Sequence, residues 1–255
     1  MKMNNSDKWQ VTGDRKPNAP GAMQSGHGSR VTGHIPAFTL IELLTVIAVI
    51  AVIAALIFPV AGAVKRQGFI HTAQAEMSQI ETALERYHSA YGFYPPGSQQ
   101  YGPLTNQLYY ELVGTAVTNN GVNNYVTLDN SAMIPVASVP TAFGANVGGF
   151  MNCNKPNADE SAPHAQNFLP GLKPNQIGTV SSYGVAISNL VTSVGGPDLN
   201  YLPLGAPDVN PWRYVYPGVN NPNSYDLWVQ LRIAGKFYLI CNWSSQVQIN
   251  NGSVP

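Results

Sequence analysis

Residues 38–58 read FTLIELLTVIAVIAVIAALIF, an apolar run that is interrupted near its start by one carboxylate, Glu42. About twenty residues at roughly 1.5 Å per residue match the roughly 30 Å hydrocarbon core of a bilayer, so the run predicts a membrane-spanning helix. An ionised glutamate inside lipid is costly unless it is paired, so Glu42 indicates a function that depends on a partner. The alternative is that Glu42 lies near the membrane edge and reaches the headgroups.

The residues before this run carry a surplus of positive charge. Residues 1–37 hold five bases against two acids, a net charge of +3 (Lys2, Lys8, Arg15, Lys16 and Arg30 against Asp7 and Asp14). Positive charge beside a span marks its cytoplasmic side, so everything after Phe58 is expected across the membrane. This leader is rich in Gly, Asn, Ser and Pro, so we expect it to be disordered, and Met23 is an alternative start. An ordinary secretory signal is the competing interpretation, but the apolar run is too long and no Ala-x-Ala site follows it.

The helix is predicted to continue as an amphipathic segment over residues 59–91. Apolar residues recur at spacings of three and four along one stripe and polar residues fill the other faces, which is typical of a helix packed on a domain. The stripe holds Ile70, Ala73, Met77, Ile80, Leu84, Tyr87 and Tyr91. Pro59 removes one backbone hydrogen bond and predicts a kink, and Gly92 with the turn at 95–97 ends the helix. A coiled coil is the alternative to packing against a sheet.

The remaining residues, 92–255, predict a β-rich extracytoplasmic domain. Near its end, three segments of β-type composition are separated by turn residues, which predicts an antiparallel meander that covers the helix. These segments are 212–216, 225–231 and 237–243. The stretch 101–207 is rich in Gly, Asn, Pro and Ser and is expected to be an insertion of loops and short strands, at 125–128, 133–139 and 180–194. We therefore expect an α+β protein in which the insertion is either solvated decoration or a binding surface.

Residue patterns that carry catalysis or bind cofactors are scarce. The chain has no His-x-x-x-His or Cys-x-x-Cys spacing, no phosphate-binding glycine loop and no Gly-x-Ser-x-Gly motif, so we expect no enzyme, no cofactor and no metal. Without the leader the chain has eight bases and eleven acids, a net charge of −3, which offers no basic surface for nucleic acid. The two cysteines, Cys153 and Cys241, either form a disulfide in an oxidising compartment or stay free.

The start of the apolar run resembles the processing signature of type IV prepilins and of type II secretion pseudopilins. In that family, Phe-Thr-Leu-Ile-Glu before a hydrophobic helix is cut ahead of the Phe by a prepilin peptidase, which also methylates the new amino group. The resemblance implies cleavage between Ala37 and Phe38 and pairing of Glu42 with the N-terminal amine of a neighbouring subunit. Ala37 departs from the Gly that the family usually has before the cut, whereas Pro59 is a further similarity.

Two other stretches are similar to major pseudopilins. Residues 83–95 end a helix in aromatic residues before Tyr-Pro, and residues 210–228 match the Pro-Trp and Tyr-Asp-Leu strands of a family hairpin. Family members often hold calcium in the loop after the second strand. Calcium takes six to eight oxygen ligands and residues 229–236 supply no carboxylate, so we expect this site to be missing and Asp226 to make a local hydrogen bond.

The resemblance implies a pilin-like fold and a structural subunit of a type II secretion pseudopilus. Such a subunit is a single-pass protein of the bacterial inner membrane with its C-terminal domain in the periplasm. Its expected partners are copies of itself, other pilin-like subunits, the prepilin peptidase, the inner-membrane assembly platform and membrane lipid. The alternatives are a type IV pilus pilin or minor pilin, and a signal-anchored extracytoplasmic binding protein that does not polymerise.

Overall fold

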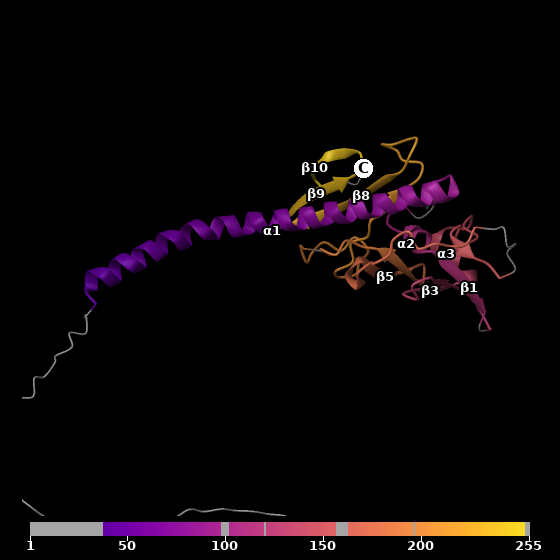
Figure 1. Cartoon of the computed structure of the whole chain (residues 1–255), viewed down its shortest axis with the longest axis horizontal. Helices are drawn as coiled ribbons and strands as arrows, with labels where there is room; N and C mark the ends of the chain where they lie inside the picture. Colours follow the sequence, from indigo (N-terminus) through magenta and orange to yellow (C-terminus); the bar gives the residue numbers. More distant parts are fainter. Residues whose placement is uncertain (1–37, 98–101, 120, 157–162, 196, 253–255) are drawn as a thin grey trace, which may run out of the picture. The chain divides into compact units, whose positions relative to one another are not determined.

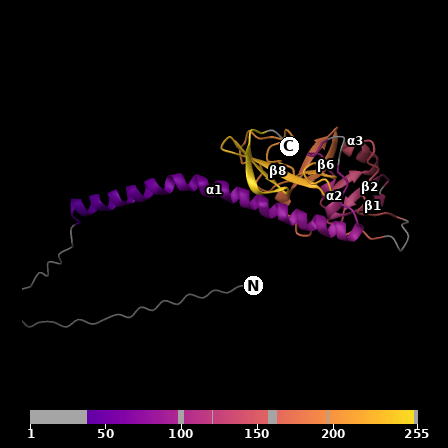
Figure 2. The same ribbon diagram turned by 90° about the horizontal axis from the view of Figure 1, so that it is seen from above.

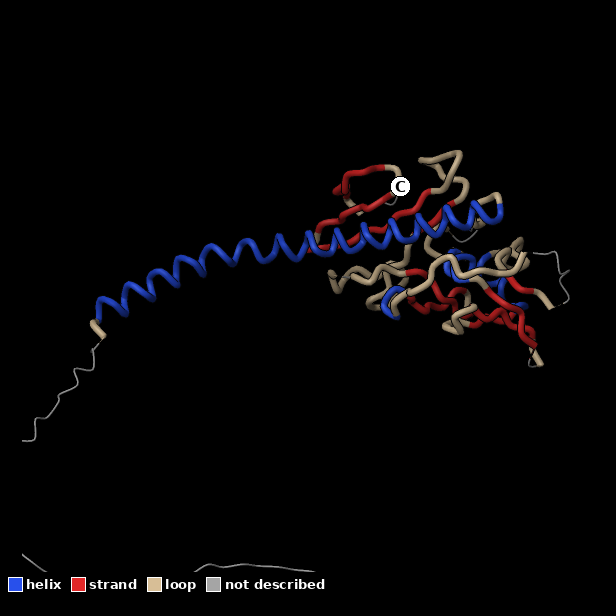
Figure 3. Tube along the Cα trace, in the orientation of Figure 1, coloured by secondary structure: helices blue, strands red, loops and turns tan. Residues whose placement is uncertain are grey.

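The structure, a computed structural model, describes residues 38–97, 102–119, 121–156, 163–195 and 197–252. The chain forms two units, Met1–Ala51 and Val52–Pro255. The predicted leader, including Ala37 of the expected cleavage site, lies outside the described residues. One long helix is followed by short helices and small, mainly antiparallel sheets, which confirms the predicted α+β class (Figure 3).

Helix α1 (Leu40–Tyr91) contains both the apolar run and the amphipathic segment. Among the described helices it is the one that is long and apolar enough to cross a membrane, and the side chains of its most apolar stretch are not buried by the chain. Its backbone is helical through Pro59. The side chains of residues 58–61 lie outside the described part, so the predicted kink at Pro59 stays a prediction.

The second half of α1 contributes one side of the hydrophobic core of the C-terminal unit. The predicted stripe is confirmed, because its members are buried (Ile70, Ala73, Ile80, Leu84 and Tyr87) or packed partly buried against the same core (Met77 and Tyr91). The helix ends at Tyr91, and the N–H of Gly92 donates to the carbonyl of His88 at 2.8 Å. Gly92 has a φ of +80°, the left-handed conformation that lets a glycine end a helix, as the sequence predicts.

An antiparallel sheet near the C-terminus lies along this part of α1 (Figures 1 and 2). Its order is β10-β9-β8-β7, with bounds β7 Arg213–Val215, β8 Asp226–Ile233, β9 Lys236–Cys241 and β10 Ser244–Asn250. Alternate residues of a strand face opposite sides, and Leu227, Val229 and Leu231 of β8 share one core with α1. The predicted three-stranded meander is confirmed as β7, β8 and β9, and β10 is a fourth strand that the sequence analysis missed.

The insertion contains more regular structure than its composition predicts. Its elements are α2 (Leu108–Val113), β1 (Thr115–Asn119), β2 (Asn123–Thr127), β3 (Met133–Pro135), η1 (Val136–Ser138), α3 (Val139–Phe143), β4 (Cys153–Asn154), η2 (Pro174–Gln176), β5 (Ile177–Ser182) and β6 (Val185–Leu190). The first four strands form a sheet in the order β3-β2-β1-β4, and β5 pairs with β6. Every residue of α2 is buried, and its apolar residues belong to the same core as α1. Solvated decoration is therefore a wrong description of this part of the insertion.

Two of the three strands predicted in the insertion differ in the structure. The segment 133–139 is a strand only to Pro135, because the 3-10 helix η1 begins at Val136 and α3 follows it from Val139. Pro140 lies in the first turn of α3, where the fixed φ of proline suits a helix. The segment 180–194 is not one strand, because Tyr183 and Gly184 have φ of +48° and +81° and reverse the chain between β5 and β6. The strand predicted at 125–128 corresponds to β2.

Candidate functional site

A reciprocal cap between Thr39 and Glu42 begins α1. The backbone N–H and the hydroxyl of Thr39 each donate to Glu42 Oε2 at 2.8 Å, and the N–H of Glu42 lies 3.3 Å from Thr39 Oγ1. This is a capping box, in which a Thr and a Glu three residues later satisfy free N–H groups at a helix start. The sequence analysis missed it, although the spacing Thr-x-x-Glu is its recognisable signal.

The surface around this cap is apolar and exposed. Phe38 and Leu40 are 78% and 81% exposed, and the large apolar side chains that follow as far as Ile57 are also exposed. Glu42 makes no ion pair with any residue that the structure describes. A continuous apolar surface of this kind marks contact with a membrane or another protein. At the start of α1, therefore, Glu42 has no cationic partner among the described residues, and the apolar side chains around it are not buried by the chain.

A second acid, Glu111 on α2, is buried and has three donors. Its carboxylate accepts the backbone N–H groups of Met151 (2.8 Å) and Asn152 (2.9 Å) and the hydroxyl of Tyr87 on α1 (3.0 Å). Burial raises the pKa of Glu111 above its ordinary value, and the three hydrogen bonds offset part of this rise. Glu111 thus ties α1, α2 and the loop before β4 together at one point.

Asn152 extends the same network. Its side-chain amide donates to the carbonyl oxygens of Glu111 and Gln166, and its side-chain oxygen accepts the hydroxyl of Tyr91 at 2.8 Å. The sequence analysis missed this network because Glu111 is a lone acid in an apolar stretch and its loop partners lie 40 and 41 residues further along the chain. No local pattern reports such a pairing.

Asp226, the acid of the Tyr-Asp-Leu strand, holds a loop in place. Its carboxylate accepts the backbone N–H groups of Val219, Asn220 and Asn221 at 2.8–3.0 Å, which confirms the predicted local role. Gly218 lies against this carboxylate, and a Cβ added there would meet Asp226 Oδ1 at 2.6 Å. The carboxylate of Asp226 therefore fixes the backbone of residues 219–221, and only a residue without a Cβ fits at Gly218.

Residues 229–236, which the sequence analysis compared with a calcium loop, belong to the tight β8–β9 hairpin. Ala234 and Gly235, with φ of +50° and +76°, turn the chain between the two strands. Across the residues described here, no group of three or more His, Cys, Asp or Glu side chains is placed to hold a metal ion.

Both cysteines are free thiols in this structure. Cys153 lies on β4, whereas Cys241 is buried at the end of β9 in the other sheet. Cys241 packs in a small cluster on the sheet with Trp228 and Leu239. The pairing of Cys153 with Cys241 in an oxidising compartment stays a prediction.

The fold and these sites define a class: an α+β protein with one helix that is long and apolar enough to anchor it in a membrane. Comparisons of the chain with protein-family models, with characterised proteins and with solved structures give no match. Function must therefore be argued from the residues and their geometry.

Proposed function

We propose that this protein is a pilin-like structural subunit, cut before Phe38 and polymerised through α1 into a type II secretion pseudopilus. One observation carries the proposal: the exposed apolar half of α1 holds a single carboxylate, Glu42, close to its N-terminus. An acid in that position needs a cation once lipid or protein covers the helix. A new N-terminal amine on a neighbouring subunit is such a cation.

The proposed assembly exchanges lipid contacts for protein contacts. Subunits wait in the inner membrane, and the assembly platform moves them into a bundle of α1 helices, where side-chain packing replaces lipid packing. Cleavage is needed first, because it creates the charged amine of Phe38 next to the helix start. The C-terminal unit is expected to remain folded during this exchange, because the hydrophobic residues of its core begin at Phe69 and the apolar run before them is not part of it.

A type IV pilus pilin or minor pilin shares all of these features. A membrane-anchored binding protein that does not polymerise is the second candidate, and the capping box favours it. The hydrogen bonds with Thr39 give Glu42 a role at the helix start that requires no neighbouring subunit.

The first test is the N-terminal sequence and intact mass of the protein purified from its native membrane. The proposal expects a chain that begins with N-methylated Phe38. A host strain that lacks its prepilin peptidase is the control and should yield the uncut chain. An uncut chain beginning at Met1 or Met23 in the normal strain would exclude the pilin mechanism and leave a simple anchor.

A further inference from the structure

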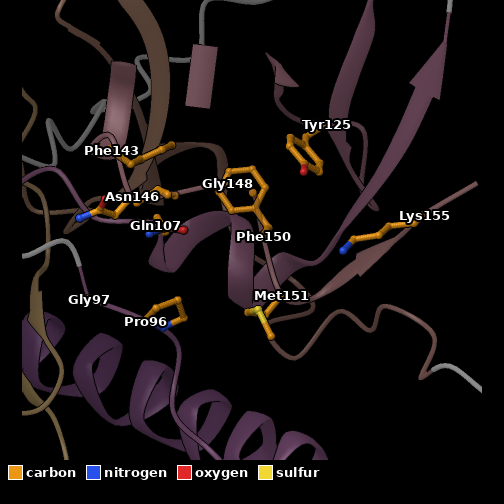
Figure 4. A pocket seen from close by; sticks show the side chains of 13 residues that line it. Pro96, Gly97, Gln107, Tyr125, Phe143, Asn146, Gly148, Phe150, Met151 and Lys155 are labelled. Carbon is orange, nitrogen blue, oxygen red and sulfur yellow. The ribbon is translucent and has the colours of Figure 1, made fainter. Parts of the chain in front are cut away.

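A cavity of about 490 Å³ lies between the start of α2, strand β2 and the loop that joins α3 to β4 (Figure 4). The rings of Tyr125 and Phe143 that line it pack against the ring of Phe150, so these walls belong to the hydrophobic core. A surface that is open to a partner lies elsewhere in the C-terminal unit, where β8 turns into β9.

The first charged residues of α1 after Glu42 are Lys65 and Arg66, and both are exposed. The uncharged stretch before them, residues 43–64, is about 33 Å long at roughly 1.5 Å per residue. That length matches the roughly 30 Å hydrocarbon core of a bilayer. With α1 across a membrane, Lys65 and Arg66 therefore lie in the headgroup layer on the side of the C-terminal unit.

Strand β8 runs back along α1 toward these two bases. Tyr225, just before β8, contacts the ring of Tyr94 at a centroid distance of 4.9 Å, and the hydroxyl of Tyr94 donates to Glu85 of α1 at 3.0 Å. Cys241, which pairs three residues further along β8, lines a small cavity together with Met77 of α1. From Tyr225 onward the strand thus passes from the level of Glu85 to that of Met77 and continues toward the start of α1.

The turn between β8 and β9 reaches the level of the two bases. Strand β9 extends from Cys241 back to Lys236, a distance of about 17 Å at roughly 3.4 Å per residue. The same distance along α1 is roughly 11 residues at 1.5 Å each, which leads from Met77 to Arg66. Figure 1 shows β8 and β9 alongside α1. Lys236 and the turn before it are exposed and therefore lie close to the headgroup layer.

A segment that precedes β7 lies against this turn and exposes apolar side chains. The carboxylate of Asp198 accepts the N–H of Gly235 at 3.3 Å and lies 3.5 Å from Arg232 Nε. Leu199 follows Asp198 directly and is 84% exposed, and Leu202 is 43% exposed. Exposed apolar side chains beside a membrane-spanning helix can insert at the boundary between headgroups and acyl chains.

The unpaired charges at this level of the molecule are positive. Lys65, Arg66 and Lys236 are exposed, and none of them forms an ion pair with a residue that the structure describes. The fourth base, Arg232, is paired with Asp198. Bases that lie within a Debye length of a membrane are attracted by anionic lipid headgroups.

We propose that this end of the C-terminal unit binds the surface of the membrane that holds α1. Leu199 inserts between the lipid headgroups, and Lys65, Arg66 and Lys236 bind the phosphates of anionic lipids. The inference depends on a membrane-spanning α1, which the pilin subunit and the anchored binding protein share. It does not depend on cleavage or polymerisation.

Photo-cross-linking to lipid tests the contact. The full chain is reconstituted in vesicles of phosphatidylcholine and phosphatidylglycerol with one photoreactive residue, and lipid adducts are counted by intact mass. Leu199→p-benzoylphenylalanine should give at least about fivefold more adduct than Val219→p-benzoylphenylalanine. Val219 is the matched control, because it is 82% exposed and its loop is held by Asp226 at the opposite end of β8. Equal yields at the two positions would overturn the proposal.

A third position separates docking of the unit from anchoring of the chain. Ile50 lies in the apolar run, so Ile50→p-benzoylphenylalanine should form adducts wherever α1 enters the bilayer. Adducts at position 50 without adducts at position 199 would overturn the docking and leave the membrane anchor intact. The absence of adducts at position 50 would overturn both.

The charge contribution is measured on the chain with the photoreactive residue at position 199. Combined Lys65→Gln, Arg66→Gln and Lys236→Gln should lower its adduct yield at least about fivefold, and so should vesicles of phosphatidylcholine alone. Lys155→Gln is the matched control, because this exposed lysine lines the cavity beside Gly97, beyond the other end of α1, and it should leave the yield unchanged. An unchanged yield in the triple variant would overturn the role of the three bases.

Discussion

Glu42 and Glu111 are two carboxylates that the same chain places among apolar residues, and they are partnered in opposite ways. Glu42 is exposed near the start of α1 and is bonded only to Thr39, three residues away. Glu111 is buried in the C-terminal unit and receives three donors from two distant parts of the chain. The carboxylate of Glu42 therefore has hydrogen bonds only from a residue of the same helix start, whereas that of Glu111 has three donors from distant parts of the chain.

The two acids distinguish a part of the chain that is stabilised by its own contacts from a part that needs contacts with a membrane or with other subunits. The C-terminal unit contains a buried hydrophobic core and supplies its internal acid with donors, so it is expected to fold on its own contacts. The first half of α1 leaves its apolar side chains uncovered. A membrane or neighbouring subunits must supply the cover there, and with it the cation for Glu42.

The largest expected effect is on assembly and comes from Glu42. We expect Glu42→Ala to lower incorporation into fibres at least about tenfold, because a charge pair is lost, while the unfolding midpoint of the C-terminal unit stays unchanged. Incorporation is measured by shearing fibres from cells and quantifying the subunit. Glu42→Gln is the matched control, because Gln keeps the capping box but not the charge. If Glu42→Gln assembles normally, the charge-pairing argument is wrong.

Glu111→Ala should have the largest effect on folding stability. The substitution leaves two buried donors and one partly buried donor without an acceptor. At about 1–3 kcal/mol each, we expect the free energy of unfolding to fall by about 3–5 kcal/mol after partial relaxation. Chemical denaturation followed by tryptophan fluorescence measures the change. Glu111→Gln keeps the shape and one acceptor oxygen and should lose less. A loss under about 1 kcal/mol in the Ala variant would show that the network contributes little.

Two leucines on α1 test the comparison within one helix. Leu84 is completely buried, so Leu84→Ala should lower the free energy of unfolding of the C-terminal unit by about 2–5 kcal/mol through lost burial and a cavity. Leu44 is 54% exposed in the N-terminal unit, and Leu44→Ala should change the same quantity by less than about 0.5 kcal/mol. Equal losses in the two variants, measured by denaturation in detergent, would contradict the division into a closed core and an uncovered half.

The smallest expected effect is a pH dependence that comes from Glu111. Because its pKa in the folded state is raised above 4.5, the folded chain keeps a proton that the unfolded chain has released. The free energy of unfolding should therefore fall as the pH rises from 4.5 through the raised pKa, by at most about 1.4 kcal/mol per pH unit. Glu111→Gln should lack this slope, and denaturation curves recorded across the window for both proteins measure the difference. Parallel curves would show that Glu111 does not titrate in this range.

Sequence patterns were reliable where one periodicity persisted over many residues. The stripe from Ile70 to Tyr91 and the meander after Trp212 are confirmed, because each residue adds to the same signal. Short elements such as α2 and β1 span five or six residues and lack such support. The capping box at Thr39 was readable and was missed, whereas the donors to Glu111 had no local signal.

The amino-acid sequence alone determined the long apolar helix, the position of Glu42 within it and the α+β class, because these depend on length, period and composition along the chain. Only the tertiary structure decided that α2 is core, that Glu111 bridges α1 to the loop before β4, and that the two cysteines lie in different sheets. These features depend on residues brought together across tens of positions, and such contacts are set by packing and not by local pattern.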